Sequence, residues 1–319
     1  MGQPVRRLAL LAVLVAVAGC GGGAGKSPVA VETPQKEADA GDAQGSLPAW
    51  TRPYLADKGP EVALVFSTSD YGAGENRIGF LIVRNDGALV QALKADVYVG
   101  PDGPGEPVRT VATLEPVGPH THPGGVEPHD HVDATDIYVA RVQTPSPGRY
   151  WVVVQPEGNA IQGIGTLDVR RETVTPPRGS KAVPSDNPTL ADAPAEQITT
   201  ASPPDTELLR YSIASSIEAH VPFVAVFATP KYCQSRTCGP TVEVVDEVRR
   251  RIGASVRFIH VEIYKDNDPQ KGPNRWVGEW KLPTEPWVFL VDGSGVIRAK
   301  FEGSVDVGEL ETAVREYLL

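Results

Sequence analysis

A continuous apolar run at residues 223–227 (FVAVF), followed closely by two cysteines, constrains the fold of this chain most strongly. Uninterrupted apolar residues predict a strand that is buried on both faces, as in the sheet of an α/β fold. Residues 240–252 have the apolar spacing of a helix, and Gly253 is suited to end it. Cys233 and Cys238 therefore lie between a buried strand and a helix, where two thiols can form and break a disulfide.

The rest of residues 201–319 completes an α/β pattern with a mixed central sheet. A helical stripe precedes the buried strand, and a second strand, a short helix, a hairpin and a closing helix follow the cysteines. In chain order, these elements are expected at residues 208–217, 256–263, 274–280, 287–291 with 296–301, and 310–318.

Residues 47–171 alternate short β-type runs with turn sequences such as NDG at 85–87 and PSPG at 145–148. Seven runs are expected as strands, at residues 61–66, 77–83, 95–99, 109–114, 136–142, 150–155 and 166–169. Short strands without a helical period predict an all-β antiparallel sandwich.

Three further segments frame these two domains. Residues 1–19 begin with Arg6 and Arg7 and continue in an apolar run that is too short to span a bilayer, as in a signal peptide. Residues 20–46 are rich in Gly, Ala, Pro and charge, which predicts a flexible tether. Residues 172–200 are polar and Pro-rich and are expected to be a linker. The expected domains are thus 47–171 and 201–319.

The net charge argues against nucleic acid as a partner. The chain holds 30 Lys and Arg residues and 40 Asp and Glu residues, for a net charge of −10. Removal of residues 1–19 with their two arginines would make it −12. Nucleic-acid binding needs a basic face, which this balance disfavours.

Four of the six histidines are close together in the sequence, at His120, His122, His129 and His131. If each His-x-His pair is extended, its two imidazoles point the same way. Imidazole suits Cu or Zn, so a site for one of these metals is possible here, and no other cofactor is required. The alternative is a solvated polar loop. The two remaining histidines, His220 and His260, are expected to be structural.

The signal-like segment ends in the sequence Val17-Ala18-Gly19-Cys20. This motif resembles the lipobox of bacterial lipoproteins, in which the cysteine becomes the first residue and is acylated. The resemblance implies a lipid anchor such as palmitate at Cys20 and a place on the extracytoplasmic face of the cell membrane, where disulfides persist. The alternative is an ordinary secretory signal with a chance cysteine.

Residues 136–142 (DIYVARV) and 147–154 (PGRYWVVV) carry a recognisable pattern. They resemble the last hairpin of bacterial immunoglobulin-like domains. The resemblance implies an immunoglobulin-like β-sandwich for residues 47–171 and says almost nothing about function, because such sandwiches have many roles.

The residues around the cysteine pair are more specific. The apolar strand ends at Phe227, and Pro240 lies within the helix that follows the cysteines. Later, Pro286 precedes the strand-like sequence WVFLVD at 287–292. These features resemble the thioredoxin superfamily over nearly all of residues 201–319. The resemblance implies a thioredoxin-like fold in which Pro286 is a cis-proline beside the thiols.

Two departures from that family bear on activity. The usual spacing is Cys-x-x-Cys, whereas four residues separate Cys233 and Cys238. Positions i and i+5 of a regular helix lie about 140° apart around its axis, whereas a disulfide needs Cα atoms within about 7 Å. Cys233 is therefore expected before the helix, unless the first turn distorts on oxidation. In addition, Val226 replaces the buried acid of the family's preceding strand.

The two cysteines have different expected roles. Cys233 lies at or before the helix N-terminus, where unpaired N–H groups favour a thiolate nucleophile. Lys231 and Arg236 are near in sequence and would add positive potential. Cys238 would then be the more buried resolving thiol. The alternative is a permanent disulfide that closes a short loop.

These observations predict a lipid-anchored thiol–disulfide oxidoreductase that acts on extracytoplasmic proteins with thiols or disulfides. One alternative is a metal-binding or partner-binding lipoprotein with a non-catalytic thioredoxin fold, in which copper passes between the histidines and the thiolates. A peroxiredoxin-like peroxidase is a further alternative, since one branch of that family has a Cys-x4-Cys pair. Pro230 and Val226, however, replace the residues that its catalytic loop needs.

Overall fold

The computed structural model describes residues 47–56, 59–119, 136–158, 161–233, 235 and 237–319. The predicted signal peptide, the tether with Cys20, and Arg236 lie outside these ranges. So do the four clustered histidines, His120, His122, His129 and His131. Within the described ranges, no helix has the length and apolar character needed to cross a membrane.

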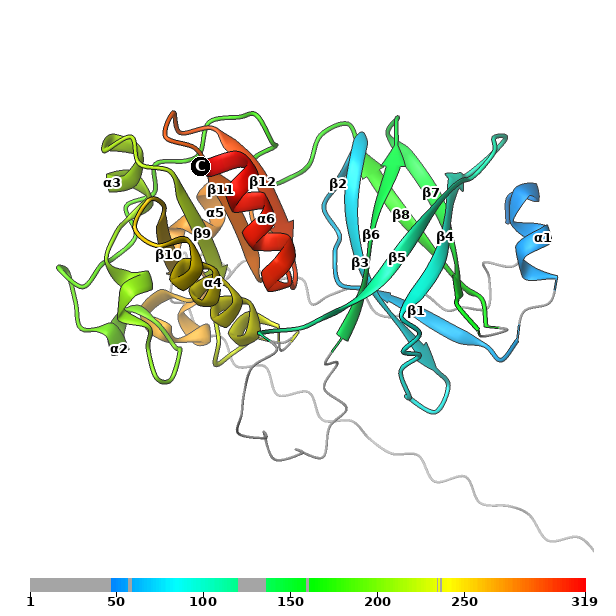
Figure 1. Cartoon of the computed structure of the whole chain (residues 1–319), viewed down its shortest axis with the longest axis horizontal. Helices are drawn as coiled ribbons and strands as arrows, with labels where there is room; N and C mark the ends of the chain where they lie inside the picture. Colours follow the sequence, from blue (N-terminus) through cyan, green and yellow to red (C-terminus); the bar gives the residue numbers. More distant parts are fainter. Residues whose placement is uncertain (1–46, 57–58, 120–135, 159–160, 234, 236) are drawn as a thin grey trace, which may run out of the picture. The chain divides into compact units, whose positions relative to one another are not determined.

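Residues 47–170 form a short helical segment and one curled sheet of eight strands, called here the β-rich region (Figure 1). The helical segment is η2 (Ala49–Thr51) and α1 (Arg52–Leu55), and the strands are β1 (Val62–Phe66), β2 (Tyr71–Gly72), β3 (Gly74–Arg84), β4 (Lys94–Pro101), β5 (Val108–Pro116), β6 (Asp136–Thr144), β7 (Gly148–Pro156) and β8 (Gly163–Arg170). Their order is β1-β3-β6-β5-β4-β7-β8-β2. All seven predicted strands are confirmed, and the two-residue β2 is additional.

The sheet curls so that β1 packs against β8, and the apolar core lies inside the curl. Ile78, Phe80 and Ile82 alternate along β3 and are almost fully buried there. A Cβ atom at Gly165 would lie 2.7 Å from the ring of Phe66, so only glycine permits this close approach of the two strands. The layers expected of a sandwich are therefore parts of one hydrogen-bonded sheet.

The predicted hairpin of residues 136–142 and 147–154 is wrong. β6 pairs with β3 and β5, whereas β7 pairs with β4 and β8. The turn between them thus carries the chain from one part of the curled sheet to another. The phenol of Tyr150 stabilises this crossing, since it donates to the carbonyl of Ser146 at 3.0 Å and accepts from the Ser146 N–H at 3.2 Å.

The second sheet has four strands in the order β10-β9-β11-β12 and belongs to the α/β region, residues 195–318. Its strands are β9 (Phe223–Ala228), β10 (Arg257–Glu262), β11 (Trp287–Val291) and β12 (Ile297–Glu302). Its helices are α2 (Ala195–Ile198), η3 (Thr206–Leu209), α3 (Ile213–Glu218), α4 (Cys238–Ile252), η4 (Lys265–Asn267), η5 (Pro269–Lys271), α5 (Arg275–Glu279) and α6 (Val307–Leu318). β10 is parallel to β9, and β11 is antiparallel to both of its neighbours. The predicted mixed sheet is confirmed.

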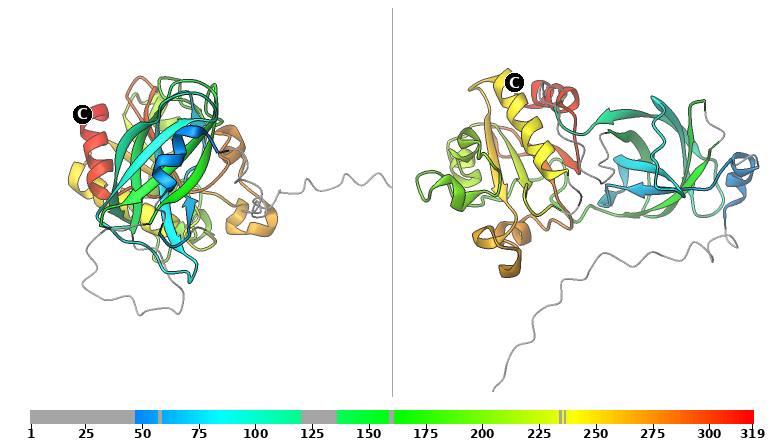
Figure 2. Two further views of the ribbon diagram at one scale, coloured as in Figure 1. Left: turned by 90° about the vertical axis from the view of Figure 1, so that its right-hand side faces the viewer. Right: turned by 90° about the horizontal axis from the view of Figure 1, so that it is seen from below.

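The apolar run that opened the sequence is β9, the inner strand of this sheet. Val224 and Val226 belong to the core beneath α4 and α6. Phe223 and Phe227 belong to the core on the other face, with residues of α3 and α5. Figure 2 shows α4 and α6 on one face of the sheet. Because both faces are covered, every residue of β9 is buried, which explains the uninterrupted apolar sequence.

The helix expected across residues 208–217 is divided in two. η3 ends at Leu209, and α3 begins after Ser212, whose hydroxyl accepts from the Ser215 N–H at 3.0 Å. The Ser215 hydroxyl in turn accepts from the Ser212 N–H at 3.1 Å, which completes a capping box. This start signal interrupts the apolar stripe, because the capping residue adopts an extended backbone.

Residues 172–200, expected to be a linker, are packed against both regions. The N–H groups of Val174 and Thr175 donate to the buried carboxylate of Asp70 at 2.6 and 3.0 Å. Further along, Lys181 forms a β-bridge with Val296 at the β11–β12 hairpin. The many prolines in this segment give it an extended shape, and its donors still find partners on neighbouring elements.

Candidate functional site

Cys233 and Cys238 are joined in a disulfide, and their Cα atoms are 5.9 Å apart. α4 begins at Cys238, so Cys233 lies in the turn between β9 and this helix. Of the two arrangements expected from the wide spacing, the structure has the one in which the first cysteine precedes the helix. The non-helical turn brings the two Cα atoms within the range that a disulfide allows.

The two sulfurs differ in their surroundings. Cys238 is 0% exposed within the core of α4 and α6, whereas Cys233 is only partly buried. The Cys238 N–H donates to the Cys233 Sγ at 3.2 Å, and the Ser235 Oγ lies 3.3 Å from the same sulfur. These donors at the start of a helix would stabilise negative charge on Cys233, so this sulfur is suited to be an attacking thiolate.

Pro286 is buried and directly precedes β11, which pairs with β9. The Glu285–Pro286 peptide bond is cis, as the resemblance to the thioredoxin superfamily implied. The carbonyl of Pro286 accepts from the Gly303 N–H at 2.9 Å. The segment 284–286 is thereby attached to the end of β12.

The carboxylate of Glu285 is the third functional group at this site. One of its oxygens and the two sulfurs of Cys233 and Cys238 all lie within 4.8 Å of one another. Burial raises the pKa of Glu285 to about 7, and the negative charge of Glu262 acts in the same direction. The resemblance implied that Pro286 lies beside the thiols but assigned no role to the carboxylate of Glu285, the residue directly before it.

A hydrogen-bond network holds the segment that carries Glu285. The Thr284 hydroxyl donates to Glu302 at 2.7 Å, and the Trp287 indole N–H donates to Thr284 at 3.1 Å. Glu302 also accepts from the N–H groups of Ser69 and Asp70, at 2.8 and 2.9 Å. A buried carboxylate at the end of β12 thus connects the site to the β-rich region.

His260 and Glu262 lie on β10, next to the strand that leads to the cysteines. Each is almost fully buried, at 3% and 4% exposure. The His260 Nε2 lies 3.1 Å from the carbonyl of Ala228, and burial lowers the pKa of this imidazole. Glu262 accepts from both the N–H and the hydroxyl of Thr200, at 2.8 Å each. His260, expected to be structural, is thus buried and hydrogen-bonded beside the end of β9.

A groove of about 1150 Å³ lies beside the cysteine turn. Pro230, Lys231, Tyr232 and Gly239 line it from the turn and the first residues of α4. Its opposite wall includes the proline-rich stretch 202–204. The groove offers room for an extended peptide beside Tyr232, the residue that precedes Cys233.

The wall formed by α4 and the segment before η3 carries the carboxylates of Asp205, Glu243, Asp246 and Glu247, and Arg250 on the same wall pairs with Asp246 and Glu247. Burial raises the pKa of Asp205 to about 6, and the nearby Asp246 carboxyl contributes. Gly118, at the end of β5, packs against the start of α4, because a Cβ atom there would lie 3.2 Å from Pro240. Both regions therefore contribute to the surroundings of the cysteines.

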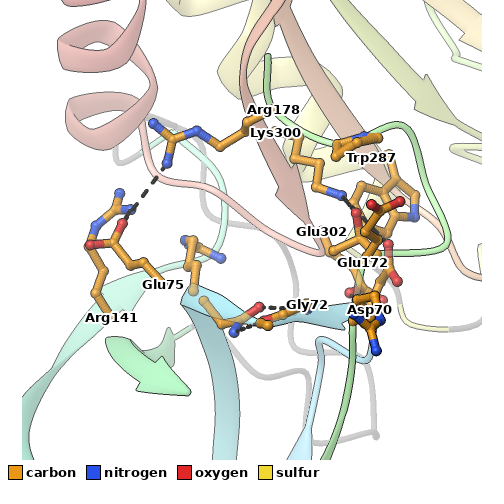
Figure 3. A pocket seen from close by; sticks show the side chains of 15 residues that line it. Asp70, Gly72, Glu75, Arg141, Glu172, Arg178, Trp287, Lys300 and Glu302 are labelled. Atoms are coloured by element: carbon orange, nitrogen blue, oxygen red, sulfur yellow. Dashed lines mark hydrogen bonds and ion pairs between the residues drawn. The ribbon is translucent and has the colours of Figure 1, made fainter. Parts of the chain in front are cut away.

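A separate cavity of about 290 Å³ is lined by charged residues of both regions (Figure 3). Lys300 donates to the hydroxyls of Thr173 and Thr175 at 2.7 and 2.6 Å and lies 3.6 Å from Asp70. Burial lowers the pKa of Lys300 to about 8, although Asp70 opposes this shift. On the other side of the cavity, Glu75 pairs with arginines 141 and 178, at 3.5 and 4.0 Å. Because these charged residues of the cavity lining are paired with one another, we assign them a structural role.

Within the described part of the chain, two groups of side chains have the proximity that a metal ion would need. One is the disulfide with Glu285, whose sulfurs are bonded to each other and offer no thiolate in this state. The other comprises Glu115, Asp306 and Glu309, and Arg77 already donates to Glu309 at 2.9 Å. The copper or zinc site predicted for the four histidines lies outside the described residues.

No protein-family model matches this sequence, and no curated protein matches it significantly. The functional assignment therefore depends on the sequence motifs and on the geometry of the cysteine pair.

Proposed function

We propose that this protein is a thiol–disulfide oxidoreductase, anchored by a lipid at Cys20 on the extracytoplasmic face of the cell membrane. One observation carries the proposal: a disulfide joins a partly buried sulfur before α4 to a fully buried sulfur at its first residue. This asymmetry suits a pair in which one sulfur meets a substrate and the other resolves the mixed disulfide.

The arrangement of the α/β region supports a thioredoxin-like fold for this part of the chain. β9, α4 and β10 form a parallel strand–helix–strand unit, and β11 and β12 add an antiparallel hairpin before α6. The cysteines lie between β9 and α4, and Pro286 directly precedes β11, as the resemblance to that superfamily implies.

The β-rich region supports an immunoglobulin-like assignment in two ways. β1-β3-β6-β5 and β4-β7-β8 have the strand orders ABED and CFG of that fold when the strands are lettered along the chain, omitting the short β2. In addition, Tyr150 at the start of β7 bonds back to the backbone of Ser146, as in the tyrosine corner of such domains. In this proposal, the region positions the redox site.

The proposed reaction exchanges one disulfide for another. In the reducing direction, the Cys233 thiolate attacks a sulfur of a substrate disulfide, and the leaving substrate thiolate takes a proton. The Cys238 thiol then loses its proton and attacks the Cys233 sulfur. The protein disulfide forms and the second substrate thiol is released. The reverse sequence oxidises a substrate dithiol, with the same atoms and electrons exchanged.

Trapping of mixed disulfides tests this proposal. We expect Cys238→Ser to accumulate covalent complexes with extracytoplasmic proteins through Cys233, because the resolving thiol is missing. Cys233→Ser, the matched control, should trap none and should lose exchange activity with a disulfide-containing protein. A reduction potential below about −300 mV for the wild-type pair, without exchange, would contradict the proposal and indicate a structural disulfide.

A further inference from the structure

Glu285 is the acidic side chain that the fold brings to the disulfide. Its carboxylate comes from the segment before β11, and an oxygen lies within 4.8 Å of both sulfurs. That separation is within the reach of a single bridging water. The strand that leads to the cysteines has no acidic residue, since all of β9 is apolar. The carboxylate beside the disulfide therefore comes from the segment before β11 and not from β9.

We propose that Glu285 is the proton-transfer group of this dithiol: its carboxylate accepts the proton of Cys238 when the disulfide forms and returns it when the disulfide opens. This inference depends on the proposed oxidoreductase function and adds a catalytic residue to it.

The step balances in both directions. During reduction of a substrate, the Cys238 S–H bond breaks and its proton passes to the Glu285 carboxylate. The freed thiolate attacks the Cys233 sulfur, the protein S–S bond forms and the mixed S–S bond breaks. The electron pair of the broken bond leaves on the substrate sulfur, which is protonated from solvent. In the oxidising direction, the protonated Glu285 donates to the departing Cys238 thiolate.

The need for such a group follows from burial. Cys238 is 0% exposed and packs in the core beneath α4, so solvent reaches its sulfur poorly. Cys233 is partly buried and already receives the Cys238 N–H at 3.2 Å, which stabilises its thiolate directly. The buried thiol is thus the one whose ionisation depends on a neighbouring base.

The charges around Glu285 suit a base that works near neutral pH. Besides the two sulfurs, the titratable groups of the described residues that act on it are Glu262 of β10 and Tyr264, just after β10. Burial and Glu262 raise the pKa of Glu285 to about 7, so it can both take and release a proton at that pH. Burial also raises the pKa of Tyr264, with Glu285 and then Glu262 contributing, so this phenol stays neutral.

The backbone that carries Glu285 is anchored at the residue on each side of it. The Thr284 hydroxyl donates to the buried Glu302 at 2.7 Å, and Pro286 is fixed by the Gly303 N–H at 2.9 Å. Anchors on both sides of Glu285 restrict the movement of its backbone. A restrained segment can present a carboxyl group to a sulfur in one orientation, which efficient proton transfer requires.

Two-phase kinetics on the full reduced chain would test the inference. The probe is a small aromatic disulfide, which releases one thiol when Cys233 attacks and a second when Cys238 resolves the mixed disulfide. For Glu285→Gln, we expect the first phase to be unchanged. The second should slow about a hundredfold at pH 7, the lower range for a positioned base. It should then rise with hydroxide concentration, and the ionisation near pH 7 should disappear from its profile.

Two further variants serve as a partial rescue and as a control. Glu285→Asp should restore part of the second-phase rate, because it keeps a carboxylate at a shorter reach, and it serves as the test if the glutamine variant does not fold. Glu316→Gln, which removes an exposed carboxylate of α6, should match the wild type in both phases.

Three outcomes would overturn either the inference or the oxidoreductase function on which it depends. A second phase with wild-type rate and pH profile in Glu285→Gln would show that Glu285 carries no proton. Equal slowing of both phases by Gln and Asp would indicate only a loosened site. Absence of exchange in the wild type would instead refute the oxidoreductase function itself, which separates the two failures.

Discussion

At the scale of single residues, position relative to the helix start decides what each cysteine can do. Cys238 begins α4 and is buried, whereas Cys233 precedes the helix and accepts hydrogen bonds. Val226 stands where the superfamily that the sequence resembles has a buried acid, and its side chain is fully buried in β9. A carboxylate oxygen of Glu285, from the segment before β11, lies within 4.8 Å of both sulfurs.

The raised pKa of Glu285 predicts a pH-dependent stability. Its pKa is about 7 in the folded protein and near 4.5 as the ordinary value. Between these values the folded protein binds more protons than the unfolded chain, so the stability contributed by this group falls as the pH rises. Relative to Glu285→Gln, the wild type should lose up to about 2 kcal/mol between pH 4 and pH 8, allowing for partial solvent screening.

Urea denaturation of the oxidised proteins at several pH values measures this difference. Glu316→Gln, on an exposed surface of α6, should follow the wild type at every pH. A difference between wild type and Glu285→Gln that does not change with pH would contradict the assigned shift.

At the scale of elements, local patterns predicted the strands and helices well and their pairing less well. The seven predicted strands of the β-rich region all form, because alternation and turn residues are local signals. The hairpin expected between β6 and β7 does not form, since their partners are β3, β5, β4 and β8. The capping box at Ser212 likewise divides an apolar stripe that looked continuous.

The crossing between β6 and β7 predicts a specific role for a single hydroxyl. Tyr150 is 6% exposed and its phenol both donates to and accepts from the backbone of Ser146. Tyr150→Phe should lower the free energy of unfolding by about 1 kcal/mol, because two part-buried hydrogen bonds to the backbone of Ser146 are lost.

The matched control is Tyr54→Phe, which removes a phenol oxygen from a partly buried tyrosine of α1 that stacks on Tyr98. Its change in unfolding free energy should be within about 0.5 kcal/mol, as for surface substitutions. Equal effects of the two changes in chemical denaturation would refute the special role of Tyr150.

At the scale of the whole described chain, buried charges join the β-rich region to the α/β region. Glu302 accepts from Ser69, Asp70 and Thr284. Arg77 of β3, whose side chain is 9% exposed, pairs with Glu309 of α6 at 2.9 Å. The same carboxylate of Glu302 therefore holds both the contact between regions and the segment that presents Glu285.

Removal of that carboxylate should affect both stability and the redox site. Glu302→Ala leaves the N–H groups of Ser69 and Asp70 without their acceptor, and we expect a loss of about 3 kcal/mol in unfolding free energy. Hydrogen exchange should rise in the segments around residues 69 and 284 together. Glu316→Ala should change neither quantity. Faster hydrogen exchange near residue 69 without faster exchange near residue 284 would contradict the proposal that Glu302 holds both segments.

Local sequence alone predicted the buried strand β9, the helix after it and the close cysteine pair, because periodicity and end signals act over a few residues. It also limited Cys233 to a position before the helix or in a distorted first turn, since a regular helix excludes a disulfide between thiols at that spacing. Only the tertiary structure brought the Glu285 carboxylate to the sulfurs and packed residues 172–200 against both regions. Contacts between residues far apart in the chain depend on how strands and helices pack together, so local sequence patterns do not predict them.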